Sequence, residues 1–376
     1  MKLCVVAGEA SGDLHATEVI RELRRIDPSL ELFGIGGSGL ASEGMHLVRD
    51  ARDLAIVGLF NVIRHLPMFF RAFHELTARI ERERPDGVLL VDYPDFNLRV
   101  ARECRRLGIP VVYYISPQLW AWRAKRVRQI AERVDQMLVI FPFEKDFYDR
   151  HGVAATYVGH PLVEQLAAIP RRSPQPPARP WRVALLPGSR RMEIELLLGP
   201  MLDAVARLGP DVRARLILAP TVDRAVVEGT VVARGVPVEM VEQGRLEALA
   251  DSDVAICSSG TATLEAAILG VPPVVVYRLP RLTYEVGRRL VRLPHFSLVN
   301  IVAGKQVVPE LLQAEVEGER IAAEASRLME TAHWVAARAA IDEVREKLGG
   351  PGASRRAAEK IATLVASRRS AARGER

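Results

Sequence analysis

The sequence has few of the residues that build disulfide or metal sites. Its 376 residues include three cysteines, Cys4, Cys104 and Cys257, which lie far apart and form no C-x-x-C pair. Eight histidines are scattered along the chain without the spacing of metal ligands. Neither a disulfide framework nor a zinc site is therefore indicated, and we expect no metal and no cofactor.

Long apolar runs are missing too. No uninterrupted apolar stretch reaches the roughly 18 residues that a membrane-spanning helix needs. The segment from Met1 to Ala7 leads directly into a glycine-rich turn, which is typical of a first β-strand and not of a secretory signal peptide. We therefore expect a cytoplasmic protein.

Two common nucleotide-binding signatures do not occur. The turn from Gly8 to Asp13 has its glycines at positions 8 and 12, which is not the G-x-G-x-x-G spacing of dinucleotide-binding proteins. Gly36 also stands where such proteins carry an acid after the second strand. The phosphate-binding sequence G-x-x-x-x-G-K-[ST] is absent from the chain. Binding of NAD and ATPase activity are therefore discounted, although Gly8, Ser11 and Gly12 can still bring backbone N–H groups close to an anion.

The net charge of +6 is distributed unevenly. The segment 355–376 holds seven Lys and Arg residues against two Glu residues, so it carries most of the excess positive charge. A basic tail of this kind could contact anionic lipid or nucleic acid. We favour the simpler interpretation of a solvated terminus, and we expect no nucleic-acid partner.

Strand-like and helix-like patterns alternate along the chain. The predicted strands are 2–7, 30–35, 87–91, 109–115, 135–141, 182–186, 213–219, 237–241, 253–257 and 273–277. The segment 170–180 contains five prolines, which predicts a semi-rigid linker. We therefore expect an α/β fold with two Rossmann-like domains, at 1–169 and 181–350, whose parallel sheets face each other across a cleft. A basic helix or tail is expected at 351–376.

Two carboxylates follow a buried strand in the first half. The run Val88–Val91 consists of four apolar residues, ends at Asp92 and meets Pro94, which stops further strand pairing. Asp95 follows, and Asn97 is expected to open the next helix. In open α/β sheets ligands bind at the carboxyl ends of the strands, so we expect one of the two acids to act chemically. Capping of the following helix is the alternative role.

Two turns in the second half have the composition of phosphate-binding loops. They contain Gly188, Ser189 and Arg190 after one strand, and Ser259, Gly260 and Thr261 after another. Glycine and serine can present backbone N–H groups, Arg190 supplies a guanidinium that fits a phosphate, and a helix N-terminus favours a diphosphate. Glu265 lies one helical turn further on, where it can accept hydrogen bonds from ribose hydroxyls or merely complement the helix dipole.

A helix over 58–74 carries two kinds of apolar residue. The residues predicted to face the core are Leu59, Val62, Ile63, Leu66, Phe69, Phe70 and Phe73. Phe60 and Met68 lie off that face, beside Arg64 and Arg71, which is the pattern of a helix at a membrane surface. A helix buried on two sides is the alternative.

Two tryptophans, Trp120 and Trp122, lie at a strand end ahead of a basic segment. One interpretation is a sugar platform with a phosphate-binding rim. The other, which we favour for the tryptophans, is a structural aromatic cluster.

Several short motifs occur together in a characteristic order. They are G-E-A-S-G-D at 8–13, D-Y-P-D-F-N at 92–97, S-P-Q-L-W-A-W at 116–122, F-P-F-E at 141–144, G-H-P-L at 159–162, L-P-G-S-R at 186–190, S-G-T-A-T-L-E at 259–265 and S-L-V-N ending at Asn300. Each motif is weak alone, but their order is specific. Over residues 1 to about 315 the chain resembles the lipid A disaccharide synthase family of Gram-negative bacteria, which are glycosyltransferases of the GT-B fold.

The resemblance implies an inverting transfer of diacylglucosamine from its UDP-linked form to lipid X, which is 2,3-diacylglucosamine 1-phosphate. The product would be a β-1,6-linked disaccharide, released with UDP. Residue by residue, the family's general base falls on Asp95, its diphosphate arginine on Arg190, and further nucleotide contacts on Glu265 and Asn300. The acceptor-side loops would be those that carry Gly8, Ser11, Gly12, Asp92, Asn97 and Trp120.

The resemblance also places the helix over 58–74 at the membrane, so the expected location is peripheral, on the cytoplasmic face of the inner membrane. A homo-oligomer is left open. The chain departs from the family pattern at Tyr93 and Gln118, where smaller residues are usual. Two other interpretations compete with the transferase: a UDP-sugar epimerase or hydrolase on the same scaffold, and a two-domain binding protein without catalysis.

Overall fold

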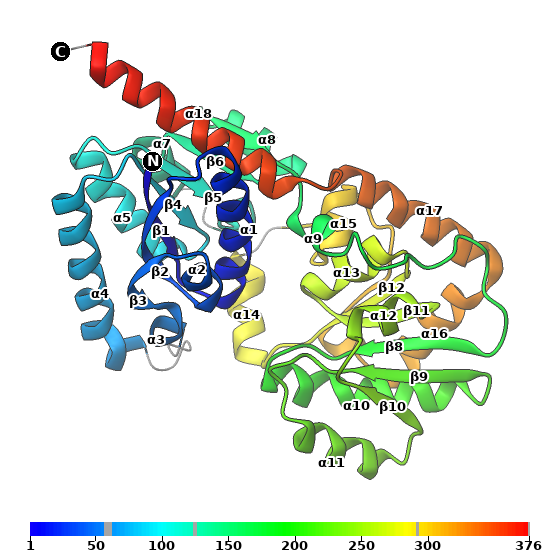
Figure 1. Cartoon of the computed structure of the whole chain (residues 1–376). Helices are drawn as coiled ribbons and strands as arrows, with labels where there is room; N and C mark the ends of the chain where they lie inside the picture. Colours follow the sequence, from blue (N-terminus) through cyan, green and yellow to red (C-terminus); the bar gives the residue numbers. More distant parts are fainter. Residues whose placement is uncertain (56–61, 123–125, 291–292, 375–376) are drawn as a thin grey trace. The chain divides into compact units, whose positions relative to one another are not determined.

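A computed structural model describes residues 1–55, 62–122, 126–290 and 293–374 (Figure 1). The chain divides into two compact units: unit 1 comprises Met1–Pro161 and Gly350–Arg376, and unit 2 comprises Leu162–Gly349. The boundary therefore lies near Pro161, ahead of the proline-rich segment. The end of the chain returns to the first unit instead of forming a separate tail.

Unit 1 is built on a parallel sheet of seven strands in the order β3-β2-β1-β4-β5-β6-β7. Its strands are β1 (Lys2–Ala7), β2 (Glu31–Gly36), β3 (His46–Asp50), β4 (Gly87–Val91), β5 (Val111–Tyr114), β6 (Gln136–Val139) and β7 (Ala155–Tyr157). Strands β1 and β4 at its centre are buried almost throughout, as their apolar sequences predict. The edge strands β3 and β7 escaped prediction because they are short and only half-buried.

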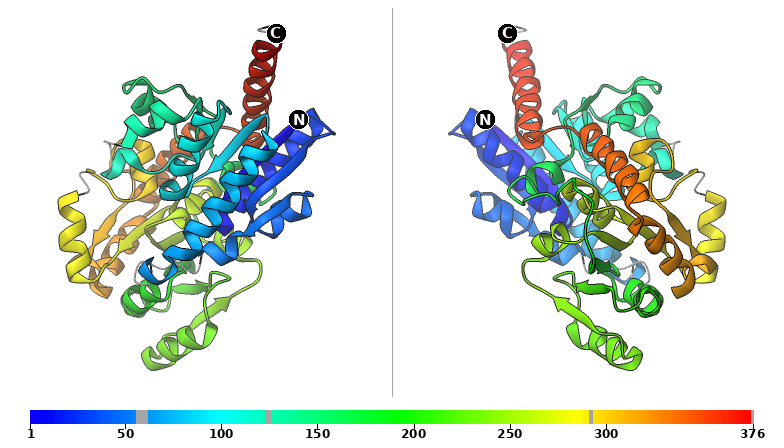
Figure 2. Two further views of the ribbon diagram at one scale, coloured as in Figure 1. Left: turned by 90° about the vertical axis from the view of Figure 1, so that its left-hand side faces the viewer. Right: turned by 90° about the vertical axis from the view of Figure 1, so that its right-hand side faces the viewer.

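Helices cover both faces of the sheet of unit 1. One face packs against α4 (Val62–Glu83), α5 (Pro94–Arg106), α7 (Val127–Arg133) and α8 (Pro142–Asp149). Helices α1 (Ala10–Ile26) and α18 (Ala353–Gly374) pack against each other, and Val365 of α18 reaches Gly87 of β4. Both views in Figure 2 show α18, in red, close to the N-terminus. Short helices α2 (Ser38–Ser42), α3 (Ala51–Ala55) and α6 (Leu119–Trp122) complete the unit.

Unit 2 repeats the plan with a parallel sheet of six strands in the order β10-β9-β8-β11-β12-β13. The strands are β8 (Trp181–Leu186), β9 (Val212–Ile217), β10 (Val238–Val241), β11 (Val254–Ser258), β12 (Pro273–Tyr277) and β13 (Glu310–Leu312). Alternate strand residues, among them Val183, Leu185 and Ile256, pack with helices α10 and α16. The helices are α9 (Pro161–Gln165), which begins at the boundary, α10 (Arg191–Leu208), α11 (Arg224–Arg234), α12 (Arg245–Ala250), α13 (Thr261–Leu269), α14 (Arg281–Leu290), α15 (Leu298–Ala303), α16 (Gly318–Met329) and α17 (Thr331–Lys347).

The proline-rich segment 170–180 has no helix or strand, and it is tied to unit 2. Arg172 forms an ion pair of 2.8 Å with the buried Asp253, and its carbonyl accepts a hydrogen bond from Arg338 of α17. Arg171 donates to the carbonyl of Ile268 in α13. The segment is therefore held along the body of unit 2, where the sequence had suggested a spacer.

None of the helices in the described ranges combines the length and hydropathy that crossing a bilayer requires.

Candidate functional site

Each sheet has one point at which the strand order reverses, and the sequence motifs gather there. In unit 1 the reversal lies between β1 and β4, which end at the paired residues Ala7 and Val91. In unit 2 it lies between β8 and β11, where Leu186 pairs with Cys257. Such switch points are where open α/β sheets bind ligands, because the loops on either side turn apart and leave a crevice. The turns after β1 and β4 therefore lie side by side in unit 1, and the turns after β8 and β11 lie side by side in unit 2.

The turn after β4 is strained. Asp92 and Tyr93 both have positive φ angles, of 46° and 48°, a backbone region that suits glycine better than any residue with a side chain. Each such residue costs roughly 1–3 kcal/mol and persists only where its surroundings hold it. Here Asn97 donates to the carbonyls of Val91 and Asp92 at 3.2 and 2.7 Å, and the Tyr113 hydroxyl donates to the Asp92 carbonyl at 2.5 Å.

Asp92 has the electrostatics of a general base. Burial raises the pKa of its carboxyl to about 6, and the nearby negative charge of Glu9 adds to the effect. A carboxyl with this pKa is ionised at neutral pH yet accepts a proton more readily than an ordinary aspartate. Asn97 and Tyr113 hold the turn in shape, because both bind the main chain of Asp92.

Asp95 lies in a different environment. Helix α5 begins at Pro94, so Asp95 is in its first turn, and Asn97 lies inside the helix instead of opening it. A proline is well suited to the first turn because it has no N–H to leave unpaired. The Asp95 side chain is 73% exposed and forms an ion pair of 2.6 Å with Arg126. Its carboxylate is therefore exposed to solvent and ion-paired at the surface.

The glycine loop after β1 is shaped by its contacts. A Cβ atom on Gly8 would lie 2.5 Å from the ring of Tyr93, so the close approach of the two turns requires glycine there. Gly12 is buried and Ser11 exposed. Asp13, which the sequence did not single out, accepts hydrogen bonds from the N–H groups of Gly37, Gly39 and Leu40, and so joins this loop to the one after β2.

Trp120 belongs to a structural cluster, the interpretation favoured from sequence. Its ring packs edge-to-face on Phe143 with a centroid distance of 4.9 Å, and its indole N–H donates to the buried carboxyl of Glu144 at 3.1 Å. Glu144 also accepts from the N–H groups of Ile140 and Phe141. Burial raises the pKa of Glu144 to about 7.

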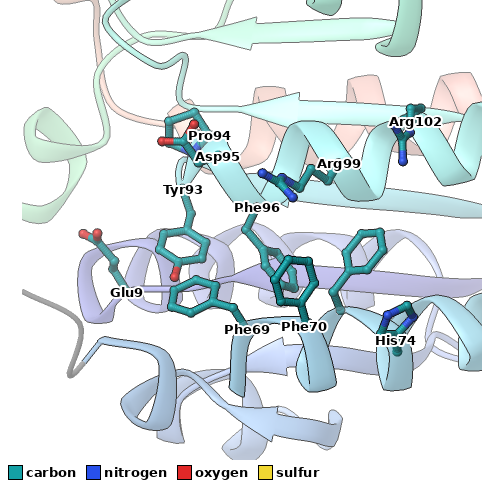
Figure 3. Close-up of a pocket in the computed structure, with 11 residues that line it drawn as sticks. Glu9, Phe69, Phe70, His74, Tyr93, Pro94, Asp95, Phe96, Arg99 and Arg102 are labelled. Atoms are coloured by element: carbon teal, nitrogen blue, oxygen red, sulfur yellow. The ribbon is translucent and has the colours of Figure 1, made fainter. Parts of the chain in front are cut away.

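An open pocket of about 870 Å³ lies in unit 1 beside the turn that carries Asp92 (Figure 3). We call it the aromatic pocket. Its lining consists of Glu9, Phe69, Phe70, Phe73, His74, Tyr93, Pro94, Asp95, Phe96, Arg99 and Arg102. Figure 3 shows the rings gathered in the middle, with the two arginines reaching in from α5. Aromatic residues are only 6% of the chain, and five of them line this one pocket.

The membrane residues proposed from sequence are only partly described. Phe60 and the side chain of Arg64 lie outside the described residues. Met68 is half-buried and packs against the core, whereas Phe70, expected in the core, is 49% exposed. The reason is the helical phase: Ala72, Leu76 and Ile80 define the buried stripe of α4, and Phe70 lies on its flank. Arg71 is exposed, as expected for a surface cation.

In unit 2 the turn after β8 is occupied by a carboxylate of the chain itself. Gly188 has a φ of 114°, and a Cβ there would collide with Glu193. Glu193 accepts hydrogen bonds from the N–H groups of Ser189 and Arg190 at 3.0 and 3.2 Å, and from the Arg190 guanidinium at 3.1 Å. The Ser189 N–H, predicted to be exposed for a phosphate, is therefore capped by an acid. The Arg190 side chain remains 78% exposed.

The turn after β11 leaves more backbone N–H groups available to a ligand. Ser259 is tied down, since its N–H donates to Val276 and its hydroxyl to Phe296. Gly260 and the exposed Thr261 begin α13, where the first N–H groups have no carbonyl within the helix to bind. This helix N-terminus can receive an anion.

Glu265 of α13 lies within the electrostatic influence of Arg245 of α12. Burial raises the pKa of Glu265, and the positive charge of Arg245 opposes that shift. The Nε atom of Arg245 is buried and has no hydrogen-bond partner among the described residues. Sequence analysis missed Arg245 because it is the first residue of the short helix α12 and belongs to no motif of its own. A ligand hydroxyl group can satisfy both, because it can accept a hydrogen bond from the Arg245 Nε–H and donate one to the Glu265 carboxylate.

Asn300 has an internal role. It is fully buried, its amide N–H donates to the Val308 carbonyl at 3.0 Å, and its carbonyl oxygen accepts from the N–H groups of Val307 and Val308. Its amide is thus engaged in holding the loop ahead of β13. The direct nucleotide contact implied by the resemblance would require this loop to rearrange.

Comparison with known proteins gives one consistent family. A family model described as lipid-A-disaccharide synthetase matches residues 3–365. A protein named lipid-A-disaccharide synthase, from Anaeromyxobacter dehalogenans strain 2CP-C, is 45% identical over 372 residues, which cover 96% of each chain.

Solved structures support the fold. The glycotransferase of kitacinnamycin matches with a TM-score of 0.66 at 18% identity, over 96% of this chain and 98% of that one. A putative UDP-N-acetylglucosamine 2-epimerase from Listeria monocytogenes matches with a TM-score of 0.64 at 14% identity, over 97% of both chains. These neighbours confirm the prediction of a GT-B fold with two Rossmann-like parallel sheets. At such low identity they bear on fold alone.

Proposed function

The chain belongs to the lipid-A-disaccharide synthetase family, and on that premise we propose that it transfers diacylglucosamine from UDP to the 6-hydroxyl of lipid X. Family membership makes it a glycosyltransferase of lipid A biosynthesis. The full-length family match carries this conclusion, because it covers both switch points and every motif between them. The epimerase alternative is not favoured, since the likeness to epimerases is one of fold only.

We propose Asp92 as the general base. It lies at the switch point of unit 1, and its raised pKa suits proton abstraction from a sugar hydroxyl near neutral pH. Asp95, the base expected from sequence, is exposed and paired with Arg126, which favours a binding role at the edge of the site. As Asp92 accepts the proton, the acceptor oxygen attacks the anomeric carbon and the bond to UDP breaks, with inversion.

Unit 2 supplies the stabilisation of the leaving group in this proposal. The N-terminus of α13, at Gly260 and Thr261, and the exposed Arg190 would hold the diphosphate as its negative charge develops. Glu193 now pairs with Arg190 and would release it to the phosphates. Glu265 and Arg245 would bind the nucleoside.

The acceptor and product are amphiphiles, so we propose that unit 1 meets the cytoplasmic face of the inner membrane as a peripheral protein. The exposed Phe70 and Arg71 of α4 support this surface contact.

The test is a reconstituted assay with UDP-diacylglucosamine and lipid X in detergent, analysed by mass spectrometry. We expect a disaccharide 1-phosphate and one UDP per disaccharide formed. Consumption of UDP-N-acetylglucosamine without any acceptor, and no disaccharide from the lipid substrates, would instead support the epimerase or hydrolase alternative.

A further inference from the structure

The aromatic pocket combines two surfaces that no step of the transfer chemistry requires. One is a wall of packed rings: Phe69 stacks on Tyr93 with a centroid distance of 6.1 Å, and Phe73 meets Phe96 edge-to-face at 6.1 Å. The other is a pair of arginines, Arg99 and Arg102, on the neighbouring helix (Figure 3). An apolar wall beside a cationic rim fits a ligand that has a hydrocarbon chain and an anionic group.

The two arginines differ from the other cations of α5. Arg105 and Arg106, at the end of the same helix, pair with Asp135 and Glu81 at 3.8 and 3.4 Å. Arg99 forms no ion pair with any residue in the described ranges, and Arg102 meets only its chain neighbour Glu103, at 3.4 Å. The two arginines that line the pocket therefore have fewer acidic partners than the arginines at the end of α5.

The other charged groups of the pocket do not neutralise this rim. Asp95 is engaged by Arg126, and Glu9 lies at the far end, beside Tyr93. His74, which comes from α4, lies at the same end of the pocket as Arg102 and can add a third hydrogen-bond donor. One end of the pocket is thus cationic, and the other end closes on the turn that carries Asp92.

We propose that the aromatic pocket is the acceptor subsite: it takes one acyl chain of the acceptor, while Arg99 and Arg102 bind the acceptor's phosphate. This inference rests on the proposed function and identifies where its acceptor lies. The volume of about 870 Å³ falls in the range of pockets that enclose small amphiphilic ligands. Tyr93 follows the proposed base directly in the chain and forms the end wall, so it sets how far the chain can extend.

The first experiment compares acceptors with and without the phosphate. In the Arg99→Gln, Arg102→Gln double variant we expect the KM for the phosphorylated acceptor to rise at least tenfold, because two charge-assisted hydrogen bonds are lost. The KM for the UDP donor stays unchanged, and so does the KM for a dephosphorylated acceptor. Arg105→Gln is the matched control on the same helix and leaves all three values at the wild-type level.

The second experiment tests the end wall. Tyr93→Gly keeps a residue that accepts the positive φ, and it removes the ring. We expect the variant to gain activity on acceptors with longer acyl chains relative to the wild-type preference. An unchanged ranking of chain lengths in a variant that melts cooperatively would overturn the assignment of Tyr93.

Two further outcomes separate the possible failures. Loss of binding to phosphatidylglycerol vesicles in the double variant, with an unchanged acceptor KM in detergent, would assign the arginines to bulk membrane lipid and overturn the proposal. Calorimetric titration of lipid X in detergent measures binding without turnover. If the wild type binds lipid X through Arg99 and Arg102 yet makes no disaccharide, the proposed function fails and the acceptor subsite stands.

Discussion

The two units share one backbone plan and differ in the chemistry at its switch point. In unit 1 the central strands end in a strained turn whose acid, Asp92, is half-buried and has a pKa raised to about 6. In unit 2 the equivalent strands end in small residues, a helix N-terminus and an exposed arginine. The sheets are alike because buried parallel strands demand only apolar residues. The proposed function therefore rests on a few side chains just beyond each strand.

The largest expected effect tests which of the two acids in unit 1 is the general base. Asp92→Asn should lower kcat about a thousandfold, since loss of a general base costs roughly 10²–10⁴ in rate. Asp95→Asn is the matched control and should lower kcat less than tenfold, because that side chain is exposed and paired with Arg126. Disaccharide formation at saturating substrate is the measurement. The reverse ranking would return the base to Asp95.

The next effect tests unit 2. Arg190→Ala should reduce kcat/KM for the UDP donor about a hundredfold, as expected when a donor to the developing diphosphate charge is removed. Arg191, the next residue, is similarly exposed and also pairs with an acid of the same helix, Glu195, so Arg191→Ala serves as the matched control. Equal activity of the two variants would remove Arg190 from the proposed diphosphate site.

A third prediction concerns the scaffold of the strained turn. Asn97→Ala removes both hydrogen bonds to the carbonyls of Val91 and Asp92, so we expect a loss of about 1–3 kcal/mol in the free energy of unfolding. The kcat should fall about tenfold as Asp92 shifts. Tyr113→Phe removes a single bond to the same turn and should have the smaller effect on both quantities. Urea titration measures the free energy of unfolding, and steady-state kinetics measure kcat.

As the pH rises towards neutrality, ionisation of Asp92 should increase the activity and decrease the stability of the fold. A base with a pKa of about 6 must be ionised, so kcat/KM should fall roughly tenfold per pH unit below pH 6. The folded-state pKa is raised above the unfolded value, so ionisation of Asp92 destabilises the fold as the pH rises from about 4 to 6. Asp92→Asn should therefore melt at a higher temperature than the wild type at pH 7.5, with a smaller difference at pH 4. A lower melting temperature of Asp92→Asn at pH 7.5 would contradict the raised pKa of the Asp92 carboxyl.

The smallest effect concerns the membrane. Phe70→Glu should weaken binding to anionic vesicles about fivefold, because an exposed ring buries only part of its surface in the interface. Val232→Glu, at an equally apolar and more exposed site on α11 of unit 2, is the control and should bind as the wild type does. Vesicle sedimentation at constant ionic strength distinguishes them. Equal loss in both variants would mean that added negative charge, and not the position of Phe70, weakened binding.

Local patterns were enough to predict much of the fold. The bounds of β12, Pro273–Tyr277, match the predicted strand 273–277, because an unbroken apolar run forms the strand. The start of α5 was placed three residues late, although a proline in the first turn is a known signal. The strand β3 has the sequence HLVRD, whose alternation is too weak to recognise.

The candidate site likewise has features that the sequence determines and features that depend on the tertiary structure. The sequence by itself determined which residue types stand at the strand ends, since motif, turn chemistry and strand pattern are all read within about ten residues. Only the tertiary structure decided which of the two acids has a raised pKa, because the pKa of Asp92 depends first on its desolvation and then on the charge of Glu9, which is distant in the chain. The same holds for Asn300 and for the aromatic pocket, formed by α4 and α5 with the loop after β1. Burial and electrostatics act through space, so a residue's role follows from the neighbours that folding gives it.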